Sequence, residues 1–417
     1  MNAAARWENV ARGLWSAVAF CFPLVLVLLP KATVLLLALV AVCGMVFLLV
    51  RRVPCHWPLS RSVVLLVVCF LVWGMLSAAW EETSGLALHK AVQLTLLCAG
   101  GFVALAFARV TPAPEGRGWG ALTAGVFVAL GFIVFERLSG CLLGGWIDIL
   151  RGQDTAICVL PRYKSAVTIL AIILPMLTLA LCSRRTIRAC GIAATLFLLV
   201  VGCAVLTSSY SAVTALVAGV LAFVLVILWP RVGTWVVAVT LATPILLAPV
   251  IASKLPTPFE AYEISDRIPS SFTHRLLIWH FVTDHIVERP VLGWGLDAAR
   301  ELPGGDGMGT IKFRVGDNHP PLLLQQQLLP LHPHNLGLQV WLETGGIGAL
   351  VFSGVLVLAV LASVRGGSRV SKAVQVATFA AIVAVALSAY GAWQSWWLSS
   401  LWLIVAFAMR MKRQDRS

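Results

Sequence analysis

Charged side chains are scarce in this sequence. They make up 12% of the 417 residues, whereas 59% are hydrophobic. A soluble domain carries about 25% charged residues, so this imbalance excludes a soluble globular enzyme, a disordered chain and a small disulfide scaffold. Twelve stretches of 18 or more residues contain no charge, and a bilayer-spanning helix needs about 20 apolar residues. The sequence therefore predicts an all-α polytopic membrane protein, with residues 1–417 forming a single integral membrane domain.

Metal-binding motifs are also lacking. The chain contains no HExxH, no CxxC and no Asp-x-Asp sequence. Two metal ligands on one helix face need a spacing near four residues, whereas His274, His280 and His285 follow one another at intervals of six and five. We therefore expect no metal site and no cofactor.

The apolar stretches are continuous rather than alternating, which indicates helices and not the strands of a membrane barrel. The last two come from one uncharged run of 37 residues, which we divide near Gly391–Ser395. Pro175 and Pro244 fall inside predicted spans and could interrupt them. The twelve predicted spans are 13–30, 32–50, 62–80, 91–108, 118–135, 165–183, 189–209, 210–229, 232–253, 344–364, 373–391 and 392–409.

The basic residues predict how these spans are oriented. With the N-terminus inside, the inner segments hold 18 of the 31 basic residues but only three of the 18 acidic ones. Basic residues favour the cytoplasmic side, so we expect both termini there. The net charge of +13 then reflects topology, and we expect no nucleic-acid partner. The first span follows Arg6 and Arg12 and lacks a small-residue cleavage site, which predicts a retained signal anchor.

Two segments on the predicted outer face are long, 136–164 and 254–343. The first contains Cys141 and Cys158, which could form a disulfide in an oxidising compartment or remain two free thiols. The second contains six of the eight histidines, and we expect the chemistry of the protein on this face. This segment is expected to consist of short helices.

The large outer segment also carries local structural signals. We expect residues 254–270 to be irregular, because they are polar and contain three prolines. A helix capped by one of the serines at 270 and 271 should reach Glu288. Pro290 then ends this helix, and Gly293-Trp294-Gly295 turns the chain.

A histidine stands where this segment returns to the membrane. The sequence reads His334-Asn335, nine further residues, Gly345, two residues and Gly348. A histidine at the membrane edge is suited to accept a proton, since its unperturbed pKa is about 6.5. The glycines let backbones or a ligand come close. The same residues could instead form a helix-capping polar cluster with a glycine packing motif, and the residues alone leave both interpretations open.

This pattern resembles a motif of the O-antigen ligase and O-antigen polymerase superfamily, the Wzy_C domain. The upstream runs Arg275-Leu-Leu-Ile-Trp279 and Pro290-Val-Leu-Gly293-Trp-Gly295 resemble that family too. Over 275–348 the resemblance is one of specific sequence motifs. Elsewhere it is limited to the architecture, which consists of twelve spans and one large outer segment between the ninth and the tenth. One departure concerns the family's frequent Ser-Arg pair, because Thr207-Ser208-Ser209-Tyr210-Ser211 has tyrosine there. If that arginine normally binds phosphate, Arg162 or Lys164 are candidates to replace it.

The resemblance implies a GT-C-like glycosyltransferase in the bacterial inner membrane, with its active site facing the periplasm. The reaction would be an inverting glycosyl transfer that needs no metal. The donor would be an O-antigen glycan on undecaprenyl diphosphate within the membrane lipid, and the acceptor a sugar hydroxyl of lipid A–core.

Such a reaction needs a base for the acceptor and cations for the leaving diphosphate, which arginine binds through two hydrogen bonds. His334 is our first candidate for the base and Arg275 for the diphosphate ligand. Asn335 and His332 would orient His334 or contact sugars. Trp279 and Trp294 could stack on sugars, or belong to an interfacial aromatic belt. Further candidate cations, each of which could instead pair with lipid headgroups or acidic residues, are Arg162, Lys164, Arg267, Arg289, Arg300 and Arg314.

Alternatives remain at this stage. Within the superfamily they are an O-antigen polymerase, against which the clean histidine and glycine pattern argues, and a protein O-oligosaccharyltransferase, against which the short tail 410–417 argues. A lipid-linked glycan flippase is a more distant alternative. Transporters bury ionisable groups or broken helices near the membrane centre, whereas the predicted spans are uncharged and only Pro175 and Pro244 could break them.

Overall fold

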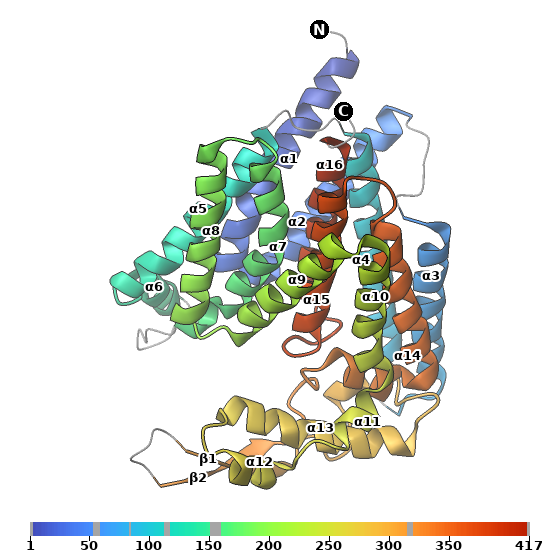
Figure 1. Cartoon of the computed structure of the whole chain (residues 1–417). Coiled ribbons are helices and arrows are strands. Elements are labelled where there is room, and N and C mark those ends of the chain that lie inside the picture. Colours follow the sequence, from blue (N-terminus) through green and yellow to red (C-terminus); the bar gives the residue numbers. More distant parts are fainter. Residues whose placement is uncertain are drawn as a thin grey trace.

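The computed structural model is a bundle of long helices with a layer of shorter elements at one end (Figure 1). It describes residues 3–52, 59–82, 85–111, 117–150, 160–314 and 320–414. The all-α polytopic membrane fold is confirmed, since ten helices of this described part are long and apolar enough to cross a membrane. Both ends of the chain lie at the end of the bundle opposite the layer of shorter elements (Figure 1). Which end faces the cytoplasm stays a prediction.

Each of the twelve predicted spans coincides with a helix. The helix α10 has 17 residues and is shorter than the ten candidates. These helices are α1 (Ala3–Leu28), α2 (Thr33–Val50), α3 (Arg61–Leu76), α4 (Leu86–Val110), α5 (Arg117–Leu138), α7 (Lys164–Cys182), α8 (Ile187–Leu206), α9 (Tyr210–Leu228), α10 (Pro230–Leu246), α14 (Leu336–Ser363), α15 (Arg369–Ala386) and α16 (Ser395–Gln414).

The positions at which the helices break match the sequence only in part. The long uncharged run is divided as predicted, because α15 ends at Ala386 and α16 begins at Ser395. Near Pro244 the chain does break, and α10 is followed by the short helix α11 (Ala248–Ala252). Pro175 leaves α7 unbroken. Helix α14 begins eight residues before the predicted span, and a non-helical Gly345 with φ 64° kinks it.

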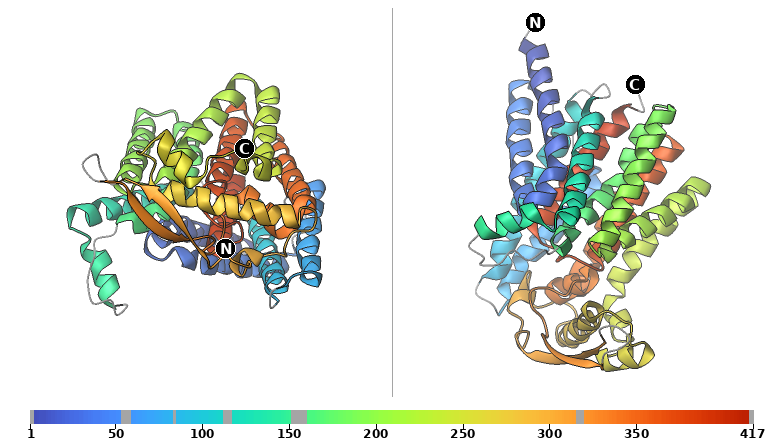
Figure 2. Two further views of the ribbon diagram at one scale, coloured as in Figure 1. Left: turned by 90° about the horizontal axis from the view of Figure 1, so that it is seen from below. Right: turned by 90° about the vertical axis from the view of Figure 1, so that its left-hand side faces the viewer.

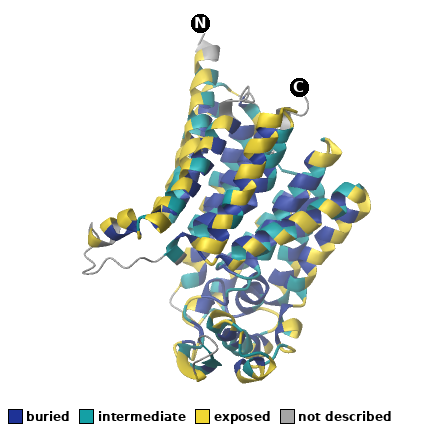
Figure 3. Ribbon diagram, turned by 60° about the vertical axis from the view of Figure 1, so that its left-hand side comes forward, coloured by how far each residue is buried: buried dark blue, intermediate teal, exposed yellow. Residues whose placement is uncertain are grey.

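The helices pack around α7, which lies against α1, α5, α8, α9 and α15. From Ala166 to Leu174 every residue of α7 is buried, which is why a run of nine apolar or small side chains without a polar face is stable there. The outer helices expose large apolar side chains, for example Leu35 and Leu198 (Figure 3). In a bilayer such surfaces face lipid, where apolar side chains are not penalised.

The short elements at the loop end include two features that the sequence analysis missed. Residues 254–270 were expected to be irregular, but they contain α12 (Pro258–Ile264), where Thr257 and Glu260 form a capping box. The expectation of short helices alone was also wrong, because strands β1 (Met308–Phe313) and β2 (Leu322–Gln327) pair antiparallel. Neither strand has the alternating pattern by which strands are recognised.

Helix α13 (Ser270–Glu288) has the predicted extent, although its N-cap is Pro269 and no serine side chain caps it. Seen from the loop end, α13 lies across the bundle (Figure 2). The remaining elements are the helix α6 (Leu142–Leu150) and the one-turn helices η1 (Pro30–Ala32), η2 (Ser77–Ala79), η3 (Leu160–Tyr163) and η4 (Ala298–Arg300).

The residue Cys141, next to α6, is disulfide-bonded. Its predicted partner Cys158 lies outside the described residues. The pairing of these two cysteines therefore stays a prediction.

Candidate functional site

The turn that leads into α14 carries three of the predicted site residues. Asn335 is the N-cap of α14, and its side-chain oxygen accepts the backbone N–H of Leu338 at 3.1 Å. Before it, His334 has a left-handed backbone with φ 54°, a conformation that non-glycine residues adopt only when their surroundings hold it. The helix-capping polar residue predicted from the sequence is therefore present as Asn335. The left-handed backbone before it sets the direction in which the ring of His334 points.

The ring of His334 has a defined tautomer. Its Nδ1 lies 2.6 Å from the carbonyl oxygen of Ala389, in the loop between α15 and α16. A carbonyl oxygen only accepts hydrogen bonds, so Nδ1 carries the ring proton and Nε2 keeps its lone pair. Among the described residues Nε2 has no hydrogen-bond partner. This is the state that a proton acceptor requires.

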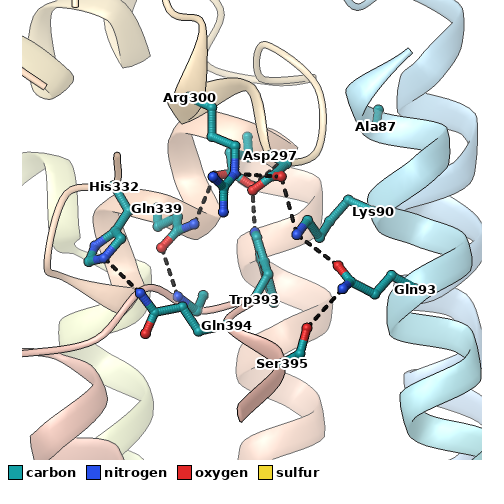
Figure 4. Close-up of polar contacts among 12 residues, drawn as sticks. Ala87, Lys90, Gln93, Asp297, Arg300, His332, Gln339, Trp393, Gln394 and Ser395 are labelled. Atoms are coloured by element: carbon teal, nitrogen blue, oxygen red, sulfur yellow. Dashed lines mark hydrogen bonds and ion pairs between the residues drawn. The ribbon is translucent and has the colours of Figure 1, made fainter. Parts of the chain in front are cut away.

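The neighbouring His332 is buried and holds the backbone of His334. Its Nδ1 accepts the backbone N–H of His334 at 3.2 Å, so a neutral ring carries its proton on Nε2. This Nε2 lies 3.1 Å from the side-chain amide of Gln394, to which it donates a hydrogen bond when the amide oxygen is turned toward the ring (Figure 4). The ring packs directly on Gly391, where an added Cβ would lie 2.8 Å from the ring carbon Cδ2. Burial, followed by the charges of His334, Arg300 and Arg275, lowers the pKa of His332 to about 3, so this ring is neutral at pH 7.

Arg275 lies beside this turn on α13. One helical turn further, the indole N–H of Trp279 donates to the carbonyl of Pro333 at 2.9 Å, which fixes α13 against the turn. The neighbouring His274 is hydrogen-bonded to the carbonyl of Gln327 on β2 at 2.8 Å. The position of Arg275 is thus set by contacts of its neighbours on both sides.

The side chain of Arg275 itself is half-buried and makes no hydrogen bond or ion pair with the described part of the chain. Burial lowers its pKa, because a guanidinium loses hydration without gaining an anion. The pKa of His334 is lowered by burial and then by the charges of Arg275 and His274, against the hydrogen bond to Ala389. The charge of Arg275 therefore acts on His334 and, like burial, favours the neutral imidazole.

A second polar cluster lies next to His332, centred on the buried Asp297. Its Oδ2 pairs with Nζ of Lys90 at 3.3 Å and with Nε of Arg300 at 2.9 Å (Figure 4). Lys90 also donates to the side-chain oxygen of Gln93 at 2.8 Å. Sequence analysis missed Lys90 because it precedes the uncharged stretch 91–108, whereas the helix begins at Leu86. A lysine at the edge of a span, with a lone aspartate in a distant turn, was the only available signal.

The fully buried Glu343 connects this cluster to α14. Its Oε2 accepts the backbone N–H of Asp297 at 2.6 Å and the indole N–H of Trp393, while Oε1 accepts from the amide of Gln339 at 2.9 Å. The oxygen of Gln339 in turn accepts the backbone N–H of Ala392 at 2.8 Å. Residues 387–394, which we call the α15–α16 loop, thus contact α14, the His332 ring and the His334 ring at once.

The motif glycines serve backbone contacts. The chain around Gly293 crosses α14 at its kink, where Trp294 N donates to Leu342 O at 2.8 Å and Gly346 N to Pro290 O at 2.9 Å. A Cβ on Gly345 would lie 2.1 Å from the carbonyl oxygen of Val291. The glycine packing predicted from the sequence is therefore explained by two backbones in direct contact, which only glycine permits.

Two other predicted cations are engaged elsewhere in the loop-end layer. Arg289 pairs with Glu82 and stacks over Trp294 at 4.0 Å from the ring centroid. It lies 14 residues after Arg275, about 21 Å along α13. Arg314 pairs with Asp266 at 2.5 Å.

The remaining candidates lie in three different segments of the chain. Arg267 is exposed in the segment before α13, and Lys164 is exposed at the start of α7. Arg162 donates to the carbonyl of Gly144 at 3.2 Å. The hydroxyl of Thr168 on α7 donates to the carbonyl of Lys164 at 2.7 Å. The structure thus brings Arg275, Trp279, Arg300, His332, His334 and Asn335 together. No contact with this group is seen, among the described residues, for Arg267, Arg289, Arg314, Arg162 or Lys164.

Comparisons with known proteins cover the part of the sequence that carries this site. Residues 194–353 match a family model described as O-antigen ligase, Wzy_C. A protein of Rickettsia conorii named "Putative polysaccharide ligase" is 35% identical over 181 residues, which are 42% of this chain and 41% of that protein. A protein of the same name from Rickettsia prowazekii is 35% identical over 179 residues, again 42% of this chain and 41% of its own. The match thus spans about two fifths of the length of these relatives. The segment that matches the family model, 194–353, contains all of 275–348, where the sequence analysis found the resemblance, and that resemblance is confirmed.

Proposed function

We propose that this chain, whose residues 194–353 carry the domain of the O-antigen ligase family, is a glycosyltransferase that uses a lipid-linked glycan inside the membrane. The donor is an O-antigen glycan on undecaprenyl diphosphate, and the acceptor is a sugar hydroxyl of lipid A–core. The loop end of the bundle faces the periplasm, and the bundle sits in the bacterial inner membrane. The observation that carries the proposal is that Nδ1 of His334 lies 2.6 Å from the carbonyl oxygen of Ala389, while neither its Nε2 nor the guanidinium of the nearby Arg275 has a hydrogen-bond partner among the described residues.

The proposed reaction assigns a role to each of these two residues. Nε2 of His334 takes the proton of the acceptor hydroxyl as its oxygen bonds to the anomeric carbon of the donor. The bond between that carbon and the diphosphate oxygen breaks at the same time, on the opposite face, so the configuration inverts. A positioned base of this kind contributes about 10²–10⁴ in rate.

Arg275 receives the negative charge of the leaving lipid diphosphate. A half-buried guanidinium without an anionic partner is destabilised until an anion binds, and a diphosphate oxygen supplies that anion with two parallel hydrogen bonds. Arg300 adds positive charge nearby, because it is 43% exposed and lowers the pKa of His332. These cations supply by themselves the charge stabilisation that other enzymes obtain from a divalent ion, so we propose a reaction independent of metal.

The test is an assay with purified protein, undecaprenyl-diphosphate-linked glycan and lipid A–core, in which the product is detected as glycan-bearing core on a gel. We expect transfer by the wild-type protein in the presence of a chelator, and a loss of about 10²–10⁴ in rate for His334→Ala. His280→Ala is the matched control, because His280 lies on α13 but is hydrogen-bonded only to the carbonyl of Pro256.

Other acceptors in the same assay separate the alternatives. Transfer to a peptide would make the protein an O-oligosaccharyltransferase, and chain growth without core would make it a polymerase. Full activity of His334→Ala on lipid A–core would refute the role of this histidine.

A further inference from the structure

The α15–α16 loop, residues 387–394, reaches both histidines of the site. The carbonyl oxygen of Ala389 is hydrogen-bonded to Nδ1 of His334, and Gly391 lies against the ring of His332. Figure 4 shows the third contact, between Gln394 and Nε2 of His332. The loop is itself held, because Ala392 and Trp393 donate hydrogen bonds to Gln339 and Glu343 on α14. These contacts form a frame around the ring of His334 that leaves only one ring nitrogen unoccupied.

The backbone of His334 depends on the same frame. Its φ of 54° is disfavoured for a residue with a side chain, and its N–H is taken by Nδ1 of His332 at 3.2 Å. The two rings stand at 62° with their centroids 4.2 Å apart. If this hydrogen bond is lost, the backbone can relax to a negative φ, and the ring then turns away from Ala389.

We propose that His332 and Gln394 are positioning residues, which hold His334 in the Nδ1–H tautomer with Nε2 directed at the acceptor hydroxyl. The proposal rests on the proposed role of His334 as the base. Neither residue needs to touch substrate, because each acts through a hydrogen bond that ends on His334 or on its neighbour. This separates them from Arg275, whose guanidinium has no partner in the described part of the chain.

The charges around His332 keep this arrangement intact. Arg275 and His274 face the histidines from α13, and Arg300 faces them from η4. A protonated His332 would carry hydrogen on both ring nitrogens and could no longer accept the N–H of His334. Since the surrounding positive charge opposes this protonation, the acceptor at Nδ1 persists at neutral and mildly acidic pH.

Two substitutions of nearly equal size distinguish positioning from a merely structural role. The side-chain oxygen of asparagine can occupy the place of Nδ1, so His332→Asn keeps an acceptor for the N–H of His334. The longer glutamine side chain reaches the place of Nε2 instead, so His332→Gln keeps the contact with Gln394 and loses that acceptor. His280→Gln, which preserves the contact with Pro256, is the control for a histidine-to-amide change in the same layer.

In the transfer assay we expect His332→Gln to lower kcat about tenfold to a hundredfold, the cost of a base displaced by roughly 1 Å. KM for the lipid-linked donor should stay within about twofold, because the diphosphate ligand is untouched. His332→Asn should retain most of the wild-type kcat. Equal losses in the two variants, or a loss confined to KM, would overturn the proposal.

A spectroscopic test does not depend on the proposed reaction. In protein labelled with ¹⁵N-histidine and reconstituted in nanodiscs, the nitrogen shifts of His334 report its tautomer, and the His334→Ala spectrum assigns them. We expect the Nδ1–H form in the wild type and in His332→Asn, and a mixture or the Nε2–H form in His332→Gln. An unchanged tautomer in His332→Gln would overturn the proposal even if transfer is reduced.

The same spectrum separates failure of this proposal from failure of the proposed function. A wild-type protein that shows the Nδ1–H form but transfers no glycan contradicts the function and leaves the positioning frame standing. If His332→Gln is not recovered folded, Gln394→Leu replaces it, because that change removes the contact with Nε2 of His332 at similar volume, together with the contact between Gln394 and the indole N–H of Trp396 at 3.2 Å. We expect a smaller loss of kcat, about threefold to tenfold, and an unaltered value would count against the role of Gln394.

Discussion

The membrane bundle and the loop-end layer both provide hydrogen-bond partners for their polar groups, but the partners come from different places in the chain. In the bundle, hydroxyl groups bond within their own helix, as Thr234 and Thr378 do to carbonyls four residues earlier. In the layer, polar groups bond across long sequence distances, as Asp297 does to Lys90 and His334 to Ala389. Local bonds survive changes in the neighbours, whereas long-range bonds depend on several segments at once. Contacts between distant segments can therefore hold the site residues of the layer in defined positions. For the same reason, we expect the layer to be much more sensitive to substitutions than the bundle.

The glycines give the largest expected difference between the two regions. Gly345→Ala places a Cβ 2.1 Å from the carbonyl oxygen of Val291 at a residue with φ 64°, so neither the space nor the backbone accepts it. We expect little or no folded protein, measured as the monodisperse fraction after size-exclusion chromatography in detergent. Gly131→Ala on α5, where an added Cβ meets nothing within 4 Å, should be recovered like the wild type. Equal yields for both variants would contradict the expectation that the loop-end layer is the more sensitive of the two regions.

Buried and exposed ion pairs give the next contrast. Asp297→Asn leaves Lys90 buried without an anionic partner, and we expect a loss of about 3–5 kcal/mol in stability. Glu8→Gln breaks the pair with Arg51 at the terminal end, where both side chains are about one third exposed, and should cost less than about 1 kcal/mol. Thermal unfolding in one detergent measures both. A shift of Tm in Asp297→Asn no larger than that in Glu8→Gln would refute the assignment of Asp297 as a buried anchor.

Removal of one cation tests whether the layer binds the leaving group. Arg275→Gln should lower kcat by about 10²–10³, because the diphosphate loses a preorganised cation, while thermal stability stays close to the wild-type value. Arg188→Gln, an exposed arginine at the terminal end, should leave kcat unchanged. Transfer assays with both variants decide the matter, and comparable activity of the two would exclude Arg275 from the reaction.

The pH profile gives the smallest and most specific effect. Burial and the charges of Arg275 and His274 lower the pKa of His334, and the base works in its neutral form. Activity should therefore remain level as pH falls through 6.5 and decline only below it. In Arg275→Gln one of the depressing charges is absent, so the acidic limb should move to higher pH. A limb that stays in place would mean that another group controls the titration.

Much of the bundle could be predicted because a membrane span is recognised from the hydropathy of its own residues. The spans, the division of the 37-residue run and the extent of α13 all follow from stretches that are read without knowledge of the rest of the chain. The motif residues Arg275, His334 and Gly345 were found in the same way, since each stands in a short recognisable run. Their roles in a reaction stay proposals.

What could not be predicted depends on contacts between distant segments. The strands β1 and β2 stabilise each other, and neither has an alternating sequence. The Lys90–Asp297 pair joins α4 to a turn more than 200 residues later. The loop at 387–394 looked like a break in an uncharged run, and only the fold shows that its carbonyl at Ala389 meets His334.

The contact between Ala389 and His334 has an evolutionary consequence, because it uses a main-chain oxygen. Any residue at this position supplies the same oxygen, so a substitution there can leave the chemistry untouched while the protein drifts in sequence. An insertion or deletion between α15 and α16 would move that oxygen and release the imidazole. Selection should thus preserve the length of this connection more strictly than its composition. In an alignment of many homologous sequences, the positions of this loop should vary in residue type but contain no gaps.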